Sequence, residues 1–417
     1  MRVRLLICTI FALAALAFGQ EEQVQNPRLR GHFTVRHPAQ TVDLATIQEE
    51  SAKGKTLPLW TFDVHSSRDG ASYPGVMVGM DPFNNPGSVS IPTNVDPLII
   101  KTKTIAVSFD STTGIVTTKP GATTFDPTAA DNACLTAPNN IPSKLFQESP
   151  ILNPATFNFG GTIVGRTQYS DAFQRGNFWE ALGSNVSKYH VLLNPKFLDP
   201  IVINVPAVYG TVLTPAFVFA NFGPPPDCGS LGIVDIGWFD NYLTSTLIPA
   251  LAAKGVYPST FPIFLVHNVV WAQSATNLFT CCDQGYHSQT GFPIPTQTYS
   301  SIDFESSGFF TPPDPGALSD TAIASHEVGE WMNDPFDMNP TPLWGHTGQV
   351  RGCQGNLEVG DPLTGTEAPP IVMANGFTYH LQELAFFSWF FGAPSLGVNG
   401  WYSNNGTFLS DAGPLCF

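Results

Sequence analysis

The chain has 417 residues, of which 18 are basic and 33 acidic, so its formal net charge at pH 7 is −15. Such a charge repels nucleic acid and anionic membrane surfaces, and neither is expected as a partner. Aromatic residues make up 12% of the chain, enough for a large core and against general disorder, while 37 glycines and 37 prolines favour ordered loops over a helical bundle.

The first twenty residues, "MRVRLLICTIFALAALAFGQ", have the pattern of a secretory signal peptide. Two arginines precede an apolar run over residues 5–18, and small residues follow near Gly19. The run is about 14 residues long, shorter than the ~20 of a spanning helix, and no later run is longer, so no membrane span is expected. We therefore predict a secreted protein, extracellular or periplasmic, with a mature charge of about −17 once Arg2 and Arg4 are removed.

Six cysteines remain after the signal peptide. An even number in an exported chain predicts three disulfides, although the sequence does not specify their pairing. We expect the two adjacent cysteines to reach different partners, and no pair has the C-x-x-C spacing of a zinc ribbon. The six are Cys134, Cys228, Cys281, Cys282, Cys353 and Cys416.

Residues 21–55 are polar and aperiodic, which predicts a flexible leader. Residues 56–140 alternate turn residues with short β-rich runs, including "LPLWTFDVHSS", "GVMVGM", "PLIIKTKTIAVSFD" and "GIVTT", which indicates a β-rich module. The Pro-rich and Asn-rich stretch "TAPNNIPSKLFQESPILNPATF" is the predicted boundary. Residues 141–417 would then form the second domain.

The second domain alternates predicted strands and helices. A first helix is expected within "IVGRTQYSDAFQRGNFWEAL", strands within "DPIVINVPAVYGTVL" and "FPIFLVHNVVWAQ", and an amphipathic helix between these strands in "FDNYLTSTLIPALAAKG". Pro249 predicts that this amphipathic helix is kinked or short, and Gly255 is its expected stop. The order of elements indicates an α+β fold.

Residues 325–335, "SHEVGEWMNDP", carry the clearest chemical pattern. The spacing predicts a helix over 320–333, capped by Ser319 or Asp320, and Pro335 disfavours helical geometry just before it. On such a helix His326 and Glu330 project from one face, where both could bind a single cation.

Glu327 lies about 100° further round the same helix, so it could activate water without binding the metal. This is the arrangement of the H-E-x-x-H helix of zinc peptidases, with Glu330 in place of the second histidine. A third ligand must come from elsewhere. Glu358 is the preferred candidate because a 28-residue loop can fold back over the helix, and His346 and Asp361 remain alternatives.

"SHEVGEWMNDP" followed by "LEVGD" resembles the "HELAE…DP…EIGD" pattern of the plant phosphate-induced (EXORDIUM-like) family and of related bacterial proteins. "CCDQGYHS" is similar to a "CGxH" element in the same relative place, and "GRTQYSDAFQRGNFW" and "YHLQELAFFSWFF" resemble uncharacterised secreted proteins of soil bacteria. The resemblance to the plant family covers about residues 280–390. It implies a zincin-like metallopeptidase fold with His326, Glu330 and Glu358 as the metal ligands.

The remaining histidines are less informative. His287 either stabilises an oxyanion in the cleft or is an ordinary polar residue after a turn, whereas His267 and His380 are expected to be structural. Zn²⁺ is the expected cofactor, although two carboxylates also suit Mn²⁺ or Ca²⁺.

Two functions remain open at this stage. The first is a zinc metallopeptidase that acts on a peptide or protein, with Glu327 as general base. The second is a non-catalytic extracellular protein that keeps the ion for stability and binds a wall component, glycan or partner through its β-rich part. A solvated helix face without any metal is the third view of the motif.

Overall fold

The structure is a computed structural model. It describes residues 43–222, 228–291, 296–310, 319–345, 353–392 and 394–413. The predicted signal peptide, most of the predicted leader, His346 and Cys416 lie outside the described residues.

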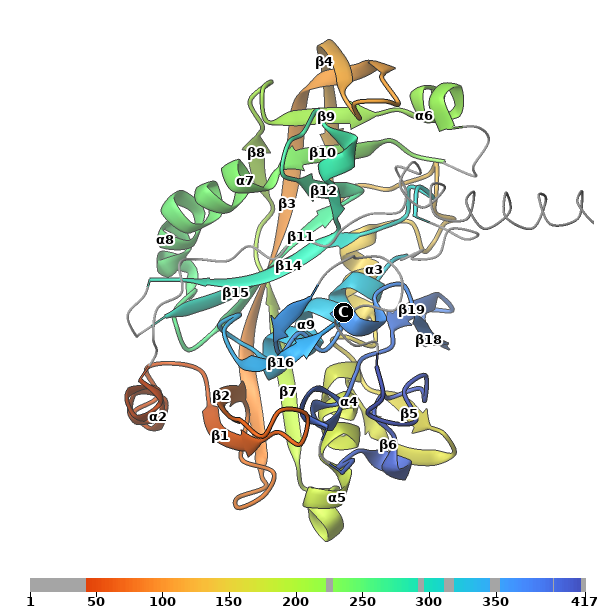
Figure 1. The fold of residues 1–417 in the computed structure, drawn as a ribbon. Coiled ribbons are helices and arrows are strands. Elements are labelled where there is room, and N and C mark those ends of the chain that lie inside the picture. Colours follow the sequence, from red (N-terminus) through yellow and green to blue (C-terminus); the bar gives the residue numbers. More distant parts are fainter. Residues whose placement is uncertain are drawn as a thin grey trace, which may run out of the picture.

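A mixed sheet of seven strands forms the centre of the fold (Figure 1). Its strands are β14 (Gly285–Thr290), β15 (Gln297–Phe304), β11 (Phe261–His267), β3 (Ser88–Phe109), β4 (Val116–Phe125), β7 (His190–Phe197) and β8 (Ile201–Asn204). The long strand β3 pairs in parallel with β7, β8 and β11, and antiparallel with β4. The predicted division at residue 140 therefore falls between strands of one sheet.

Shorter sheets surround this centre. A four-stranded sheet contains β13 (Cys281–Asp283), β12 (Val269–Ala272), β10 (Leu231–Asp235) and β9 (Gly210–Leu213). The two-stranded sheets are β1 (Leu59–His65) with β2 (Ser72–Val78), β5 (Ala155–Phe159) with β6 (Thr162–Thr167), β16 (Pro340–Trp344) with β17 (Gln354–Asn356), and β18 (Glu367–Val372) with β19 (Thr378–Gln382).

The α-helices are short. They are α2 (Leu44–Ala52), α3 (Pro142–Glu148), α4 (Tyr169–Asn177), α5 (Trp179–Leu182), α6 (Pro215–Phe222), α7 (Ile236–Tyr242), α8 (Ile248–Leu251), α9 (Ala322–Asn333) and α10 (Phe387–Phe391). Together with the sheets they confirm the α+β class. None of the helices among the described residues is long and apolar enough to cross a membrane.

The amphipathic segment is irregular, as Pro249 predicts. A π-helical turn over Leu243–Leu247 separates α7 from α8, and the segment ends at Gly255, whose φ of 99° is the left-handed conformation that glycine adopts without strain. The predicted domain boundary contains α3, which begins with a proline in its first turn.

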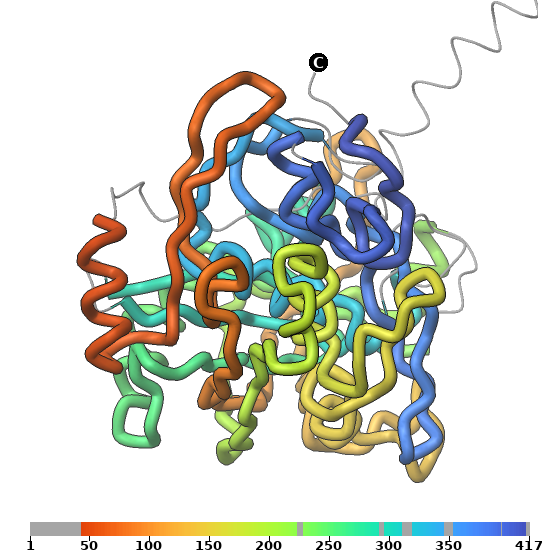
Figure 2. Tube along the Cα trace, turned by 90° about the horizontal axis from the view of Figure 1, so that it is seen from below, coloured from red at the N-terminus to blue at the C-terminus, as the bar shows by residue number. Residues whose placement is uncertain are grey.

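The two ends of the described chain pack together. The β1–β2 hairpin lies beside the C-terminal segment (Figure 2), and the rings of Phe62 and Phe387 meet edge to face with centroids 5.1 Å apart. Ser66 and Ser67 also donate hydrogen bonds to the backbone at the end of α10. Strands from the N-terminal part thus complete the core beneath the C-terminal part.

The disulfides correct one expectation. Cys134 pairs with Cys228, but Cys281 pairs with its neighbour Cys282, so the expectation of different partners for these two was wrong. A trans peptide would hold neighbouring Cα atoms 3.8 Å apart, whereas this peptide bond is cis and the Cα atoms are 3.1 Å apart. Cys353 is also disulfide-bonded.

Candidate metal centre

Helix α9 carries the H-E-x-x-E motif and lies inside the protein. Every one of its residues is buried, and it packs against β14, β15, β19 and β2. The ring of Trp331 stacks on Phe261 at 3.6 Å, and its Nε1 donates to Thr298 Oγ1. The third view, a solvated helix face, is therefore wrong, because His326, Glu327 and Glu330 are each only 1% exposed.

The ends of α9 differ in part from the prediction. The helix ends at Asn333, and Asp334 leaves it with a φ of −140°, as expected before Pro335. It begins at Ala322, however, without a side-chain cap at the residue before it. Asp320 is not the cap because its carboxylate accepts from the backbone N–H of His380 and pairs with the ring of the same residue at 2.6 Å.

Two glycines allow other segments of the chain to approach α9 closely. A Cβ atom at Gly360 would lie 2.6 Å from His326 Nδ1, and one at Gly285 would lie 2.8 Å from Glu327 Cγ. The loop that follows Glu358 and the start of β14 therefore reach α9 only because these positions have no side chain. The backbone N–H groups of Gly360 and Asp361 then donate to Glu330 Oε1 at 3.1 and 3.2 Å.

His326 is held by β19 and faces acidic side chains. Its Nδ1 lies 3.0 Å from Gln382 Oε1, and Gln382 Nε2 donates to the carbonyl of Gly360. Because the amide oxygen of Gln382 must accept, Nδ1 carries the proton. Nε2 is then directed at Glu330 Oε1, 3.0 Å away, and at Asp361 Oδ1, 3.5 Å away.

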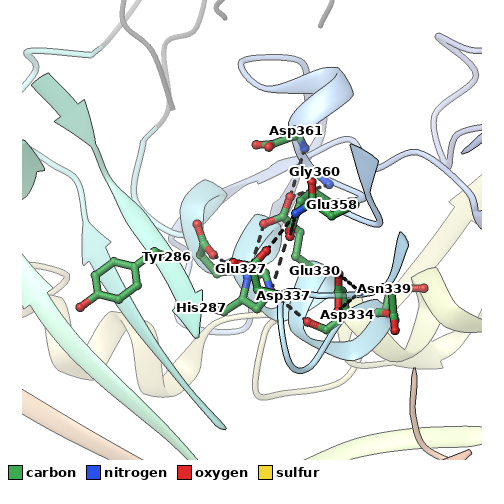
Figure 3. A network of polar contacts seen from close by, with 12 residues as sticks. Tyr286, His287, Glu327, Glu330, Asp334, Asp337, Asn339, Glu358, Gly360 and Asp361 are labelled. Atoms are coloured by element: carbon green, nitrogen blue, oxygen red, sulfur yellow. Dashed lines mark hydrogen bonds and ion pairs between the residues drawn. The ribbon is translucent and has the colours of Figure 1, made fainter. Parts of the chain in front are cut away.

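His287 on β14 lies among carboxylates of the same centre (Figure 3). Its Nε2 donates to the backbone carbonyl of Asp334 at 3.1 Å. Its Nδ1 lies 3.4 Å from Glu327 Oε2 and 3.6 Å from Glu330 Oε2. Glu358 adds a further carboxylate, with Oε2 3.8 Å from His287 Nε2.

The charges of these buried groups shift their pKa values. Burial alone would lower the pKa of His287, but the hydrogen bond to Glu327 and the nearby charge of Glu330 raise it to about 9. For His326, too, burial acts downward, and the charge and hydrogen bond of Glu330 place its pKa well above the usual value. Burial, together with the charge of Glu330, raises the pKa of Glu358 well above its usual range.

The donor atoms fit a divalent cation. Those of His326, Glu327 and Glu330 lie within 4.8 Å of one another, as do those of His287, Glu330 and Glu358. Imidazole nitrogen with carboxylate oxygen is a ligand set that Zn²⁺ accepts. Glu358 also has a buried oxygen, Oε2, that makes no hydrogen bond within the described structure, as expected of a ligand atom. A third acidic group with all-oxygen donors adjoins these two and contains Asp334, Asp337 and Glu358.

The predicted site residues therefore lie close together, but they form two overlapping groups that share Glu330. His326 and Glu330 are adjacent, and Glu327 lies 3.9 Å from His326 Nε2. Glu358 lies with Glu330 and His287, whereas the alternative ligand Asp361 lies beside His326. The metal, the third ligand and an oxyanion role for His287 stay predictions.

Sequence reasoning did not assign Gln382 to the site. The aromatic part of "YHLQELAFFSWFF" forms part of the core, since Phe386, Phe387 and Trp389 are buried. A glutamine within such an apolar run is a usable signal, because a buried amide needs hydrogen-bond partners and a metal-bound histidine commonly has one.

Comparisons with protein-family models, with curated proteins and with solved structures found no match. The resemblance to the plant phosphate-induced family stays a prediction that depends on the quoted motifs, and the function is argued below from the geometry of the centre.

Proposed function

We propose that the protein is a secreted, zincin-like hydrolase of the zinc metallopeptidase type. His326 and Glu330 hold the cation, and a carboxylate from the loop over residues 358–361 completes the shell. The observation that supports catalysis is the position of Glu327, whose carboxylate is buried between the two imidazoles at 3.9 and 3.4 Å. A site that only stabilises the fold would not need this residue.

The roles of the side chains follow from their contacts. A divalent ion bound there would polarise the substrate carbonyl, but two carboxylate ligands offset its charge, so it would acidify water less than a site with two histidines. This makes a general base more important. Glu327 takes the proton from water as the water attacks the peptide carbonyl, and then delivers that proton to the leaving nitrogen. Gln382 keeps the imidazole of His326 in the orientation and tautomer that a ligand requires.

Replacing Glu327 by Gln tests the proposal. The variant keeps the shape of the side chain but cannot accept the proton, so cleavage of a broad peptide mixture should fall by roughly 10²- to 10⁴-fold while the zinc content stays the same. The exposed Glu49→Gln on α2 is the matched control and should cleave like the wild type. Equal cleavage by Glu327→Gln and the wild type would contradict the proposed base.

A second function has its own supporting observations. The candidate metal ligands are at most 3% exposed, which suits an ion that stabilises the fold. A separate pocket of about 560 Å³ lies between β1 and the C-terminal segment, a size typical of ligand sites, and is lined in part by Trp60, Phe62, Phe83 and Phe387. The buried indole Nε1 of Trp60 makes no hydrogen bond in the described structure.

These observations suit a non-catalytic extracellular protein that binds a wall glycan on aromatic rings. It predicts metal in both the wild type and Glu327→Gln and cleavage by neither. Binding to insoluble wall polysaccharide should be weakened by Phe83→Ala, because that ring lines the pocket and is 46% exposed.

A further inference from the structure

We infer that the centre holds two divalent cations, with Glu330 bridging them and with His287 and Glu358 binding the second. This inference rests on the proposed function, in which His326 and Glu330 hold the first ion. It assigns His287 a ligand role in place of the oxyanion role expected from the sequence.

The carboxylate of Glu330 has the orientation of a bridge. Its Oε1 lies 3.0 Å from His326 Nε2, and its Oε2 lies 3.6 Å from His287 Nδ1. The two imidazoles come from different elements, α9 and β14, and approach different oxygens. A carboxylate in this position can give one oxygen to each of two ions, which in two-metal hydrolases lie about 3.5–4 Å apart.

Both histidines are prepared as ligands in the same way. A metal-bound histidine usually donates its other ring N–H to a fixed acceptor, which sets the tautomer. His326 donates from Nδ1 to the amide oxygen of Gln382, and His287 donates from Nε2 to the backbone carbonyl of Asp334. Each ring therefore has its remaining nitrogen beside carboxylate oxygens. His326 Nε2 lies 3.0 Å from Glu330 Oε1, and His287 Nδ1 lies 3.4 Å from Glu327 Oε2 and 3.6 Å from Glu330 Oε2. In a centre with one ion at His326, the same arrangement at His287 would serve only its hydrogen bond to Glu327.

Glu358 supplies the remaining donor of the second site. It is 1% exposed, and its Oε1 accepts from Asn356 Nδ2 at 2.7 Å. Its Oε2 makes no hydrogen bond in the described structure, and an unsatisfied buried carboxylate oxygen is costly. The donor atoms of Glu358, His287 and Glu330 already lie within 4.8 Å of one another, so a cation among them would satisfy this oxygen.

The general base lies beside both proposed ions. Glu327 directs Oε1 toward His326 and Oε2 toward His287. One nitrogen and two carboxylates suit Zn²⁺ or Mn²⁺ at the second site. Mn²⁺ is therefore a suitable spectroscopic probe for both positions.

The test counts the ions and asks whether they share a ligand. The full chain is freed of metal with a chelator, titrated with Mn²⁺, and followed by metal analysis and electron paramagnetic resonance. The wild type should bind two ions per chain with an exchange-coupled spectrum. His287→Asn and Glu358→Gln should each bind one, with the six-line spectrum of isolated Mn²⁺. Glu305→Gln, at a buried glutamate that belongs to none of the candidate metal groups, is the matched control and should bind two coupled ions.

The wild-type titration alone decides the inference if a variant fails to fold. One ion per chain with an uncoupled spectrum overturns the second site and leaves the proposed function standing. Two uncoupled ions overturn the bridge, and two ions retained in both His287→Asn and Glu358→Gln overturn the ligand assignment. A wild-type chain that binds no ion overturns this inference together with the proposed function.

Discussion

Two of the places where the protein buries carboxylates are the candidate metal centre and an acid pair formed by Asp303 and Glu305. In the metal centre, imidazoles from α9 and β14 face the carboxylates. In the acid pair, Asp303 accepts from the backbone N–H of Val269, and Glu305 accepts from the hydroxyl of Ser307. Burial raises the pKa of Glu305 to about 7 and, together with the charge of Glu305, raises that of Asp303 well above its usual value.

The difference shows what makes a buried carboxylate a metal ligand. Burial disfavours the charged form in both places, and the group can respond by binding a proton or by binding a cation. In the acid pair the raised pKa of Asp303 favours a bound proton. The metal centre brings nitrogen and oxygen donors from α9, β14 and the loop over residues 358–361 together in groups whose atoms lie within 4.8 Å of one another, and such groups suit a cation.

Metal removal should have the largest effect and should affect only the centre. If the ion is present at about 1,000 times its dissociation constant, its loss costs roughly 4 kcal/mol, because an ion that binds only the folded state stabilises that state by mass action. We expect the melting temperature to fall after chelation by a similar amount in the wild type and in Glu305→Gln. An unchanged melting temperature of the wild type after chelation would show that no bound ion stabilises the candidate metal centre.

The acid pair should make stability depend on pH. Because the pKa of Glu305 is raised from 4.5 to about 7, the folded state holds a proton between these values that the unfolded state has lost. Stability therefore falls as the pH rises through this window, by about 3 kcal/mol in total. Glu305→Gln removes the titration, so denaturant unfolding at pH 4 and pH 8 should show the variant gaining stability relative to the wild type at the higher pH. An equal pH dependence in both proteins would contradict the raised pKa of Glu305.

Gly360→Ala should weaken the metal centre without affecting the acid pair. The added methyl group would lie 2.6 Å from His326 Nδ1 and would displace either the loop or the imidazole. We expect a 10- to 100-fold loss of zinc affinity, the usual cost of disturbing the partners of a ligand. Gly237→Ala is the control, because its nearest neighbour would be at an ordinary 3.5 Å. Equal zinc affinity in the two variants would show that this close approach is unimportant.

The spacing of residues within one segment was enough to predict the features of that segment alone. The positions of His326, Glu327 and Glu330 follow from helical geometry, and Pro335 ends the helix whatever packs around it. The sequence could not predict contacts made across the fold. Asp320 accepts a hydrogen bond from the backbone N–H of His380 instead of capping α9. Strand β3 pairs with strands up to about 170 residues away in the sequence.

The acid pair illustrates the same limit. Asp303 lies in β15 and Glu305 follows its last residue, a spacing common among exposed residues, and only tertiary burial raises their pKa values.

The most direct test of the account is diffraction from crystals of the zinc-saturated protein at the zinc absorption edge. We predict an anomalous peak at about 2 Å from both His326 Nε2 and a carboxylate oxygen of Glu330, which is a usual zinc–ligand distance. A map without a peak at that position, or with zinc bound only elsewhere on the protein, would contradict the claim that these two side chains hold a cation.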